Sequence, residues 1–356
     1  MRIVVAMSGG VDSSVAAALL ADQGHDVIGL SMQLYDQNEG SPRFGGCCSL
    51  DDLHDARRVA AAIDIPHYIV NFERQFDAQV VSNFVREYAL GRTPLPCARC
   101  NSDLKFSALV DRARGLGADA VATGHYARVE QDALTGRYRL KRGVDRTKDQ
   151  SYFLFSLTQD QLARAMFPVG DRPKDAVREY ARSRRLPVAD KPDSQEICFV
   201  PDGDYAAFVA RRSPEAAAEG PIVDEAGRIV GRHDGIHRFT VGQRRKLGLP
   251  RSPDGRPLYV LAVRPADRHV IVGSRASLER TMLTASGVNW IVREPSDPLP
   301  VEAQIRHRHH AAPGMVRTLG DGRAEVVFNS AQVAITPGQA VVFYQDDVVA
   351  GGGWID

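Results

Sequence analysis

Short apolar runs alternate with amphipathic stretches along the first 125 residues of the chain. The apolar runs, which are typical of buried strands, lie at residues 3–6, 26–32, 68–71 and 120–123. The stretches with helical periodicity lie at residues 11–23, 51–63, 76–90 and 104–116. Strands that alternate with helices predict βαβ units. We therefore expect an α/β fold with a doubly wound parallel sheet, whose ligands bind outside the carboxyl ends of the strands.

The pattern changes near residue 200. From Gly220 onward, Gly and Pro recur between short alternating runs, which is typical of a β-rich, barrel-like region. These runs lie at residues 258–263, 269–272, 301–305, 324–328 and 340–344. A break near residues 274–281 divides this half into two parts. We therefore predict three domains: an α/β domain at 1–205, a small central domain at 206–277 and a C-terminal β-barrel at 278–356.

Length and composition fit a globular protein of two or three domains, because the 356 residues are 44% hydrophobic and 25% charged. No run of about 18 apolar residues occurs, and the N-terminus lacks the apolar region and cleavage site of a secretory signal. We therefore expect no membrane span and a cytoplasmic location. The net charge of +1 says little about partners, since a local basic patch can lie on a neutral whole.

A Gly-rich loop joins the first predicted strand to the first predicted helix. It reads Ser8-Gly9-Gly10-Val11-Asp12-Ser13-Ser14. Paired glycines let the backbone approach a phosphate, and hydroxyls and N–H groups at a helix N-terminus complement negative charge. Asp12 would repel phosphate unless Mg²⁺ bridged the two, so the loop predicts ATP with Mg²⁺. The structural alternative is a Gly-rich turn with Ser13 as an ordinary N-cap.

The five cysteines all lie in the first 200 residues, and their odd number favours catalysis or metal binding over a disulfide framework. Cys97 and Cys100 are three positions apart, and Cys198 lies far downstream. A thiolate can carry sulfur as a persulfide, and a second thiol can release that sulfur by forming a disulfide. Alternatively, the three thiols hold an iron–sulfur cluster. Cys47 and Cys48 are expected to be buried structural cysteines.

The chain resembles the bacterial tRNA-specific 2-thiouridylases, which are N-type ATP pyrophosphatases, over essentially its whole length. The matching segments occur in the same order, at residues 6–13, 46–49, 91–106, 122–127, 148–154, 239–244 and 351–355. The resemblance implies that ATP adenylates the C2 oxygen of the wobble uridine of tRNA and that sulfur then displaces AMP. It also implies two partners, the anticodon loop of tRNA and a cysteine desulfurase or sulfur-relay donor.

The resemblance implies roles for individual residues by their position in these motifs. Cys100 corresponds to the nucleophile and Cys198 to the persulfide-bearing cysteine. The nucleotide-binding positions correspond to Ala6, Met7, Ser8, Gly9, Gly10, Val11, Asp12, Ser13, Met32 and Gly124. The tRNA-binding positions correspond to Lys148, Asp149 and Gln150, with Leu95, Pro96 and Cys97 near the target base.

Two of these positions vary among family members. Leu95 stands where family members often have Asn, at a position associated with the target base, so the hydrogen bond of that Asn is not expected here. Family members have either Asp or Cys at position 97. With Cys97 present, this chain has three candidate ligands for a [4Fe-4S] cluster: Cys97, Cys100 and Cys198.

Two basic clusters suit contact with a phosphate backbone. The first, which we call the central cluster, consists of Arg238, Arg244, Arg245 and Lys246. The second, the barrel cluster, consists of Arg306, His307, Arg308, His309 and His310. Solvated loop charge is the simpler alternative, but a β-barrel carrier and the resemblance to an RNA-modifying family favour RNA contact.

Two other functions remain open on the sequence. One is a different ATP pyrophosphatase that adenylates a small molecule, which would not need paired reactive thiols or a basic barrel. The other is a non-catalytic RNA-binding protein with a degenerate nucleotide loop. The loop at residues 8–14 is complete, so this last function would require that ATP is never hydrolysed.

Overall fold

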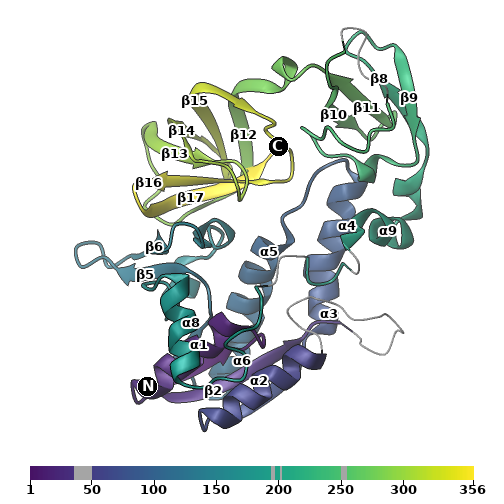
Figure 1. The fold of residues 1–356 in the computed structure, drawn as a ribbon. Helices are drawn as coiled ribbons and strands as arrows, with labels where there is room; N and C mark the ends of the chain where they lie inside the picture. The colour runs from purple at the N-terminus through teal and green to yellow at the C-terminus, as the bar shows by residue number, and fades with distance from the viewer. Residues whose placement is uncertain (36–49, 194–196, 201–202, 250–254) are drawn as a thin grey trace. The chain divides into compact units, whose positions relative to one another are not determined.

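The computed structural model describes residues 1–35, 50–193, 197–200, 203–249 and 255–356. Cys47, Cys48 and the rest of the matching segment 46–49 lie outside the described residues. The chain folds into two compact units (Figure 1). The first unit contains residues 1–80, 97–203 and 347–349, and the second contains residues 81–96, 204–346 and 350–356.

A five-stranded parallel sheet in the order β3-β2-β1-β4-β7 forms the centre of the first unit. Its strands are β1 (Arg2–Ala6), β2 (Asp26–Gln33), β3 (His67–Asn71), β4 (Ala120–Ala122) and β7 (Ala165–Met166). Strand β1 has β2 on one side and β4 on the other. The chain runs from β1 through β2 to β3 and then crosses back to β4, so the switch point of the sheet lies between β1 and β4. Ligands of such sheets bind at this switch point, beyond the carboxyl ends of the strands.

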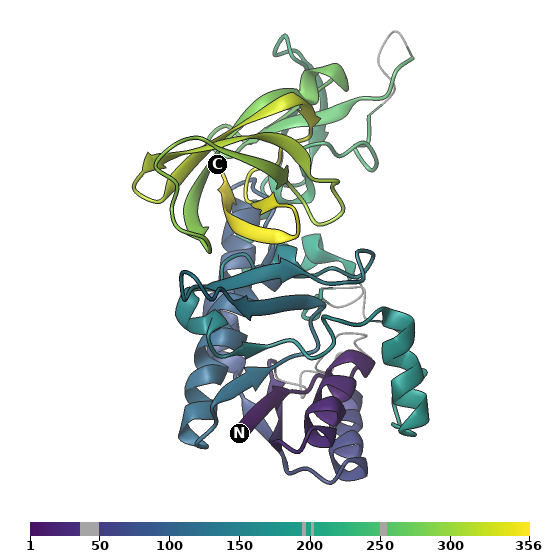
Figure 2. The same ribbon diagram turned by 90° about the vertical axis from the view of Figure 1, so that its left-hand side faces the viewer.

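Helices cover both faces of this sheet (Figures 1 and 2). They are α1 (Val11–Asp22), α2 (Leu50–Ala62), α3 (Glu73–Phe76), α5 (Pro96–Arg99), α6 (Leu109–Gly115), α7 (Gln159–Leu162) and α8 (Lys174–Ser183), with the π-helical segments η1 (Asp77–Val81) and η2 (Cys100–Ala108) and the 3₁₀ turn η3 (Ser151–Phe153). Val177 and Ala181 of α8 share one hydrophobic core with Val15 of α1. A hairpin of β5 (Ala127–Gln131) and β6 (Tyr138–Arg142) completes the unit.

The second unit contains a four-stranded sheet and a closed barrel. The sheet has the order β10-β11-β8-β9, and the six barrel strands follow the order β12-β15-β14-β13-β16-β17, with β12 also paired to β17. The sheet strands are β8 (Gly220–Val223), β9 (Ile229–His233), β10 (Tyr259–Arg264) and β11 (His269–Gly273). The barrel strands are β12 (Glu279–Trp290), β13 (Leu299–Gln304), β14 (Ala312–Gly320), β15 (Arg323–Val333), β16 (Ala340–Gln345) and β17 (Val348–Ile355).

Short helical elements precede or connect the strands of this unit. They are α4 (Ser82–Ala89), α9 (Tyr205–Arg212) and the 3₁₀ turns η5 (Pro214–Ala217), η6 (Ile236–Arg238) and η7 (Ala276–Leu278).

The predicted fold class, a parallel α/β sheet followed by a small β-rich domain and a β-barrel, is confirmed. Within the described residues, no helix combines the length and the apolar character that a membrane crossing requires.

One helix begins earlier than the sequence pattern predicts. The stretch expected at residues 104–116 is helical from Pro96 onward and is π-helical from Cys100 to Ala108. Proline suits the first turn of a helix, where no partner for its missing N–H is needed. Its presence therefore marks the true start of this helix, eight residues before the region of clear periodicity.

Candidate active site

The Gly-rich loop lies at the switch point of the parallel sheet. Ala6 ends β1, Gly10 is the N-cap residue of α1, and no side chain caps this helix. The Ser13 hydroxyl accepts a hydrogen bond from the Ser8 N–H at 3.1 Å, lies 3.2 Å from the Ser8 hydroxyl and donates to the Gly10 carbonyl oxygen at 3.2 Å, so it joins the loop to the start of the helix without capping its N–H groups. An uncapped helix N-terminus leaves backbone N–H groups available for an anion.

Two glycines of the predicted site are required by close packing. A Cβ on Gly9 would lie 2.1 Å from the backbone oxygen of Asp52, and Gly9 also has a φ of +73°. A Cβ on Gly124 would lie 2.5 Å from the backbone nitrogen of Ser13. Gly124 follows β4, the neighbour of β1, so its missing side chain lets the start of α1 approach that strand. The structure thus brings Gly124 to the loop, and nucleotide binding by Gly124 stays a prediction.

The apolar members of the predicted nucleotide site point into the core. Met7, Val11 and Met32 are 2%, 4% and 7% exposed, respectively. Met7 also accepts a hydrogen bond on its carbonyl oxygen from the Ser31 hydroxyl, at 2.7 Å. We infer that these residues anchor the loop on the sheet and that their backbone groups, rather than their side chains, face a ligand.

Asp12, in the first turn of α1, is held by two side chains from distant parts of the chain. The Lys174 ammonium donates to both of its carboxylate oxygens, at 2.7 and 2.9 Å. The Tyr126 hydroxyl donates to the same carboxylate at 2.7 Å. Burial and the neighbouring Asp12 charge raise the pKa of Tyr126 well above its usual value, so this hydroxyl remains a donor.

Lys174 also contacts Asp193, which begins the segment leading to Cys198. The distance from the Lys174 ammonium to Asp193 is 2.9 Å, and Lys148 and Arg178 contact the same carboxylate at 2.8 and 2.9 Å. Burial alone would raise the pKa of Asp193, but the hydrogen bonds from Lys148 and Lys174 outweigh it and lower the pKa to about 2. The carboxylate is therefore charged throughout the physiological range.

A second lysine holds the other end of the loop. The Lys191 ammonium donates to the carbonyl oxygen of Gly9 at 3.1 Å and to the carboxylates of Asp52 and Asp55, both at 2.6 Å. Burial would lower the pKa of Lys191, but its bonds to these carboxylates dominate and raise it. The loop is therefore fixed at Gly9 by Lys191 and at Asp12 by Lys174.

Sequence reasoning missed Lys174, Lys191 and Asp193 as members of this site. Lys174 and Lys191 contact the loop or its neighbours across more than 130 residues of chain, and Asp193 reaches the loop through Lys174, so no local spacing links the three residues to it. One weak signal was present. Lys174 occupies the first position of α8, where the helix dipole disfavours a cation.

The three described cysteines belong to the first unit and differ in exposure. Cys97, in α5, is exposed; Cys100, the first residue of η2, is buried; and Cys198 is partly exposed. The Arg99 guanidinium lies 3.9 Å from Asp103, so its charge is shared with a carboxylate rather than directed at a thiol alone. Over the described ranges, no group of three or more His, Cys, Asp or Glu residues is placed to hold a metal ion.

The helix that carries Cys100 is anchored by its neighbour Asn101. This side chain is 2% exposed; it donates to the carbonyl oxygen of Phe153 at 3.1 Å and accepts from Lys105 at 3.1 Å. Phe153 belongs to the segment 148–154. Two motifs separated by about fifty residues are therefore joined directly, and Asn101 is a positioning residue that the sequence did not reveal.

The three predicted tRNA contacts at positions 148–150 all make bonds within the chain. Lys148 binds Asp193, as described above. Asp149 accepts from the Gly143 N–H at 3.0 Å and from the Ser151 hydroxyl at 2.9 Å, and its side chain is 7% exposed. Gln150 accepts from the Tyr126 N–H at 3.0 Å. These bonds order the segment that carries Tyr126, and tRNA contact by the three residues stays a prediction.

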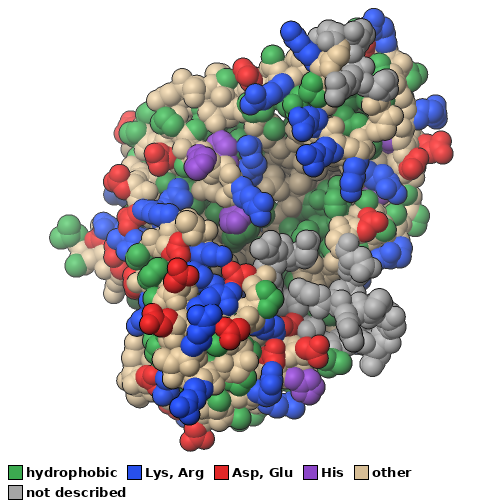
Figure 3. Space-filling model, viewed as in Figure 1, with side chains coloured by type: hydrophobic (Ala, Val, Ile, Leu, Met, Phe, Trp, Pro, Cys, Tyr) green, Lys and Arg blue, Asp and Glu red, His purple; other side chains and the backbone are tan. Residues whose placement is uncertain are grey.

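The two basic clusters lie in the second unit. In the central cluster Arg238, Arg244, Arg245 and Lys246 are exposed, and in the barrel cluster Arg306, His307, Arg308 and His310 are exposed. Figure 3 shows Lys, Arg and His side chains gathered on the visible face of this unit. The barrel cluster follows β13, and Arg306 donates to the carbonyl oxygen of Val333 at 3.2 Å. Leu95 and Pro96, also predicted near the base, are at most partly exposed.

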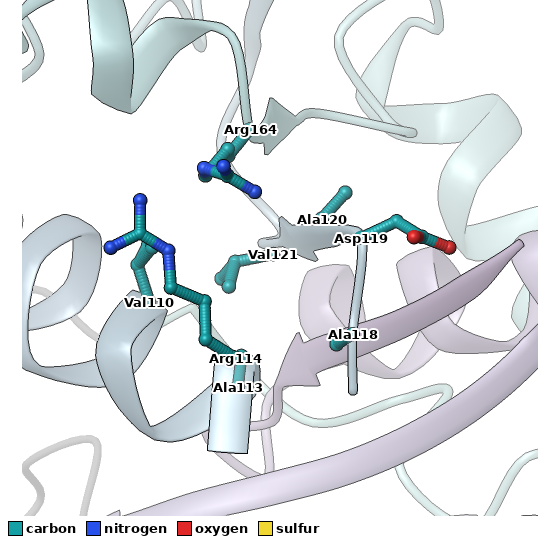
Figure 4. Close-up of a pocket in the computed structure, with 8 residues that line it drawn as sticks. All are labelled: Val110, Ala113, Arg114, Ala118, Asp119, Ala120, Val121 and Arg164. Atoms are coloured by element: carbon teal, nitrogen blue, oxygen red, sulfur yellow. The ribbon is translucent and has the colours of Figure 1, made fainter. Parts of the chain in front are cut away.

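A shallow hollow occurs at the opposite end of β4 from Gly124. Val110, Arg114, Asp119, Val121 and Arg164 are among the residues that line it (Figure 4). Because Asp119 precedes β4 whereas Gly124 follows it, the hollow lies at the amino end of the strand. It therefore does not belong to the site at the switch point.

The residues at the switch point fit a Mg²⁺–nucleotide complex better than a bare metal ion. Asp12 supplies one carboxylate, 31% exposed, beside an uncapped helix N-terminus. Mg²⁺ is commonly bound through one or two carboxylates together with substrate phosphates, rather than by a cage of protein ligands. A [4Fe-4S] cluster held by Cys97, Cys100 and Cys198 stays a prediction.

Three family models match consecutive parts of the chain. The model described as tRNA methyl transferase HUP domain matches residues 1–202. The tRNA methyl transferase PRC-barrel domain matches residues 206–274, and the aminomethyltransferase beta-barrel domain matches residues 280–355.

Curated relatives match the chain along its whole length. A protein of Geotalea uraniireducens is 54% identical, covering 100% of this chain and 95% of its own. A protein of Solibacter usitatus is 53% identical, with 99% of each chain covered, and one of Geobacter metallireducens is 52% identical, with 100% and 96% covered. All three are named tRNA-specific 2-thiouridylase MnmA. The chain therefore belongs to the tRNA-specific 2-thiouridylase family.

Proposed function

We propose that this protein is an ATP-dependent sulfurtransferase that replaces the C2 oxygen of the wobble uridine of tRNA with sulfur. The observation that carries the proposal is the uncapped start of α1 at the switch point of the sheet, held by Lys174 and Lys191. Membership of a family whose members are named for tRNA 2-thiolation supplies the substrate.

Adenylation is the step assigned to the loop. The backbone N–H groups at the start of α1 would bind phosphate oxygens, and nearby Lys174 would add positive charge. The uridine C2 oxygen attacks the α-phosphorus of ATP, pyrophosphate leaves with the bonding electrons, and the oxygen becomes part of an AMP leaving group. Mg²⁺, held by Asp12 and the phosphates, would neutralise charge on the departing pyrophosphate.

Sulfur transfer is the step assigned to Cys100 and Cys198. A cysteine desulfurase or relay protein would load Cys198 with a persulfide. The Cys100 thiolate attacks the sulfur bonded to Cys198, which forms a Cys100–Cys198 disulfide and frees hydrosulfide. Hydrosulfide adds to C2 of the activated uridine, AMP leaves with the C–O electrons, and a thiol reductant then restores both cysteines.

RNA binding is assigned to the exposed cations of the second unit. The barrel cluster and the central cluster suit phosphate contacts, which position RNA without reading its sequence. The wobble base lies in a single-stranded loop, so extruding it for chemistry costs less than it would in a duplex.

The proposal is tested by following pyrophosphate release and the nucleoside content of tRNA together. Purified protein, ATP, Mg²⁺, a persulfide donor and unmodified tRNA should yield tRNA-dependent pyrophosphate and 2-thiouridine, detected by mass spectrometry. Release of pyrophosphate that does not depend on tRNA would favour a small-molecule substrate. Methylation of tRNA from S-adenosylmethionine, with no thiolation, would contradict the proposal.

A further inference from the structure

Lys174 is a buried cation in an unfavourable place. It is 7% exposed and occupies the first position of α8, where the positive end of the helix dipole repels an ammonium group. Burying a charge is costly unless it is paired. Such a placement requires nearby carboxylates, and the two that pair with Lys174 come from outside α8.

Two carboxylates of different kinds share this ammonium. Asp12 belongs to the nucleotide loop and binds Lys174 through both oxygens, at 2.7 and 2.9 Å. Asp193 lies outside the loop, 2.9 Å from Lys174. The centroid of the Tyr126 ring lies 5.7 Å from the ammonium, which is stacked over the ring face.

The remaining partners of the two carboxylates differ in charge. Asp193 also contacts the cations Lys148 and Arg178, whereas the further partner of Asp12 is the neutral Tyr126 hydroxyl. Asp193 is therefore strongly compensated and does not leave the network easily. Asp12 depends on Lys174 for its counter-ion and is the carboxylate that faces the predicted phosphate site.

We propose that Lys174 and Asp193 are positioning residues that allow Asp12 to exchange its counter-ion, an inference that rests on the proposed function. In the nucleotide-free protein, Lys174 neutralises Asp12 and fixes its orientation at the start of α1. When Asp12 binds a nucleotide-bound cation, Lys174 keeps its contact with Asp193. The ammonium is then not left as an uncompensated buried charge, and it remains beside the phosphates.

The test measures how nucleotide binding depends on Mg²⁺. A non-hydrolysable ATP analogue is titrated into the full-length protein by calorimetry at a series of Mg²⁺ concentrations. In Asp193→Asn, Lys174 has lost its second carboxylate and holds Asp12 more firmly, so the Mg²⁺ concentration for half-maximal binding should rise about tenfold. In Lys174→Met, Asp12 has no competing cation, so that concentration should fall, while the affinity at saturating Mg²⁺ decreases.

Shifts in opposite directions are the signature of counter-ion exchange, because simple loss of packing would weaken binding in both variants alike. Asp190→Asn is the matched control: Asp190 lies in the same segment but pairs with Arg182 on the surface, so the Mg²⁺ requirement should not change. Shifts that are equal in direction or absent overturn the proposal, as does loss of binding at every Mg²⁺ concentration in folded Asp193→Asn.

The outcome is independent of the tRNA assay. Should Lys174→Met fail to fold, as judged by thermal melting, the shift in Asp193→Asn decides alone, and its absence overturns the proposal. If the protein binds nucleotide with the predicted shifts but does not thiolate tRNA, the proposed function fails and the exchange mechanism stands.

Discussion

The nucleotide loop and the basic clusters differ in how their charged side chains are placed. Around the loop, Lys174 is buried and joins the carboxylates of Asp12 and Asp193 within the first unit. In the second unit, Arg244 and Arg308 extend into solvent. Preorganised charge stabilises a developing transition state without reorganisation, whereas exposed cations act by releasing counter-ions from RNA. We therefore expect substitutions around the loop to alter the chemistry and substitutions in the basic clusters to alter RNA binding.

The largest effect is expected when the thiol that would carry the sulfur, Cys198, is removed. Cys198→Ser should lower 2-thiouridine formation by at least about 10³-fold, because the residue would form the covalent intermediate. Release of tRNA-dependent pyrophosphate should continue in a single turnover, since adenylation precedes sulfur transfer. Unchanged thiolation, measured by mass spectrometry of digested tRNA, would remove Cys198 from the mechanism.

Gly124→Ala tests how closely the loop site is packed. The new Cβ would lie 2.5 Å from the backbone nitrogen of Ser13 and would displace the start of α1. Such overpacking costs about 1–3 kcal/mol, and we expect ATP affinity, measured by calorimetry, to fall about tenfold or more. Gly115→Ala is the control, because nothing lies within 4 Å of a Cβ there. Equal behaviour of the two variants would refute the packing argument.

Removal of exposed arginines tests whether the basic clusters bind RNA. Arg308→Ala and Arg244→Ala should each weaken tRNA binding several-fold and reduce the slope of log affinity against log salt by about 0.7–0.9. Thermal stability should not change, since both side chains are exposed. Arg112→Ala, on the exposed surface of α6, serves as the control for nonspecific charge. A salt dependence identical to that of the wild type would place tRNA elsewhere.

The smallest expected effect is the dependence of stability on pH. The pKa of Asp193 is lowered in the folded protein from 3.8 to about 2, so its stabilising contribution is present above pH 4 and is lost as the pH falls toward 2. With 31% of the side chain exposed, we expect about 1 kcal/mol, less than the pKa shift alone would give. Asp193→Asn should flatten the fall in unfolding free energy over this range, whereas Asp190→Asn should leave it unchanged.

The sequence predicted those parts of the first unit that depend on local pattern. The strand before Ser8, the loop itself and the buried helix after it follow from an apolar run, paired glycines and helical spacing. Strand β7, at Ala165–Met166, was missed because two residues are too few to show a period. The start of the helix at Pro96 does not follow from periodicity, because the residues from Pro96 to Asp103 show no clear helical spacing.

In the candidate site, too, residues within local motifs can be predicted from the sequence, whereas residues paired across the chain cannot. Asp12, Gly9 and Gly124 are predicted from the sequence because they belong to motifs, and the structure places all three at the loop. Lys174 was not found, because its partner Asp12 lies 162 residues away and no alternation of residue types records such a pair. Asp149 is predicted to contact tRNA. Its hydrogen bonds with Gly143 and Ser151 cannot be predicted from the sequence, because they depend on how the chain after β6 folds beside this segment.

The bonds from Lys191 and Lys174 to the loop have a consequence for the smallest fragment that can bind nucleotide. A piece of the chain that ended after β4 would retain the complete signature string and four of the five strands of the parallel sheet. It would lack the ammonium groups that fix Gly9 and Asp12, and these two residues would be free to adopt other conformations. Recognition of the string in a short or truncated protein is therefore insufficient to infer nucleotide binding, unless the chain continues to the equivalent of Asp193.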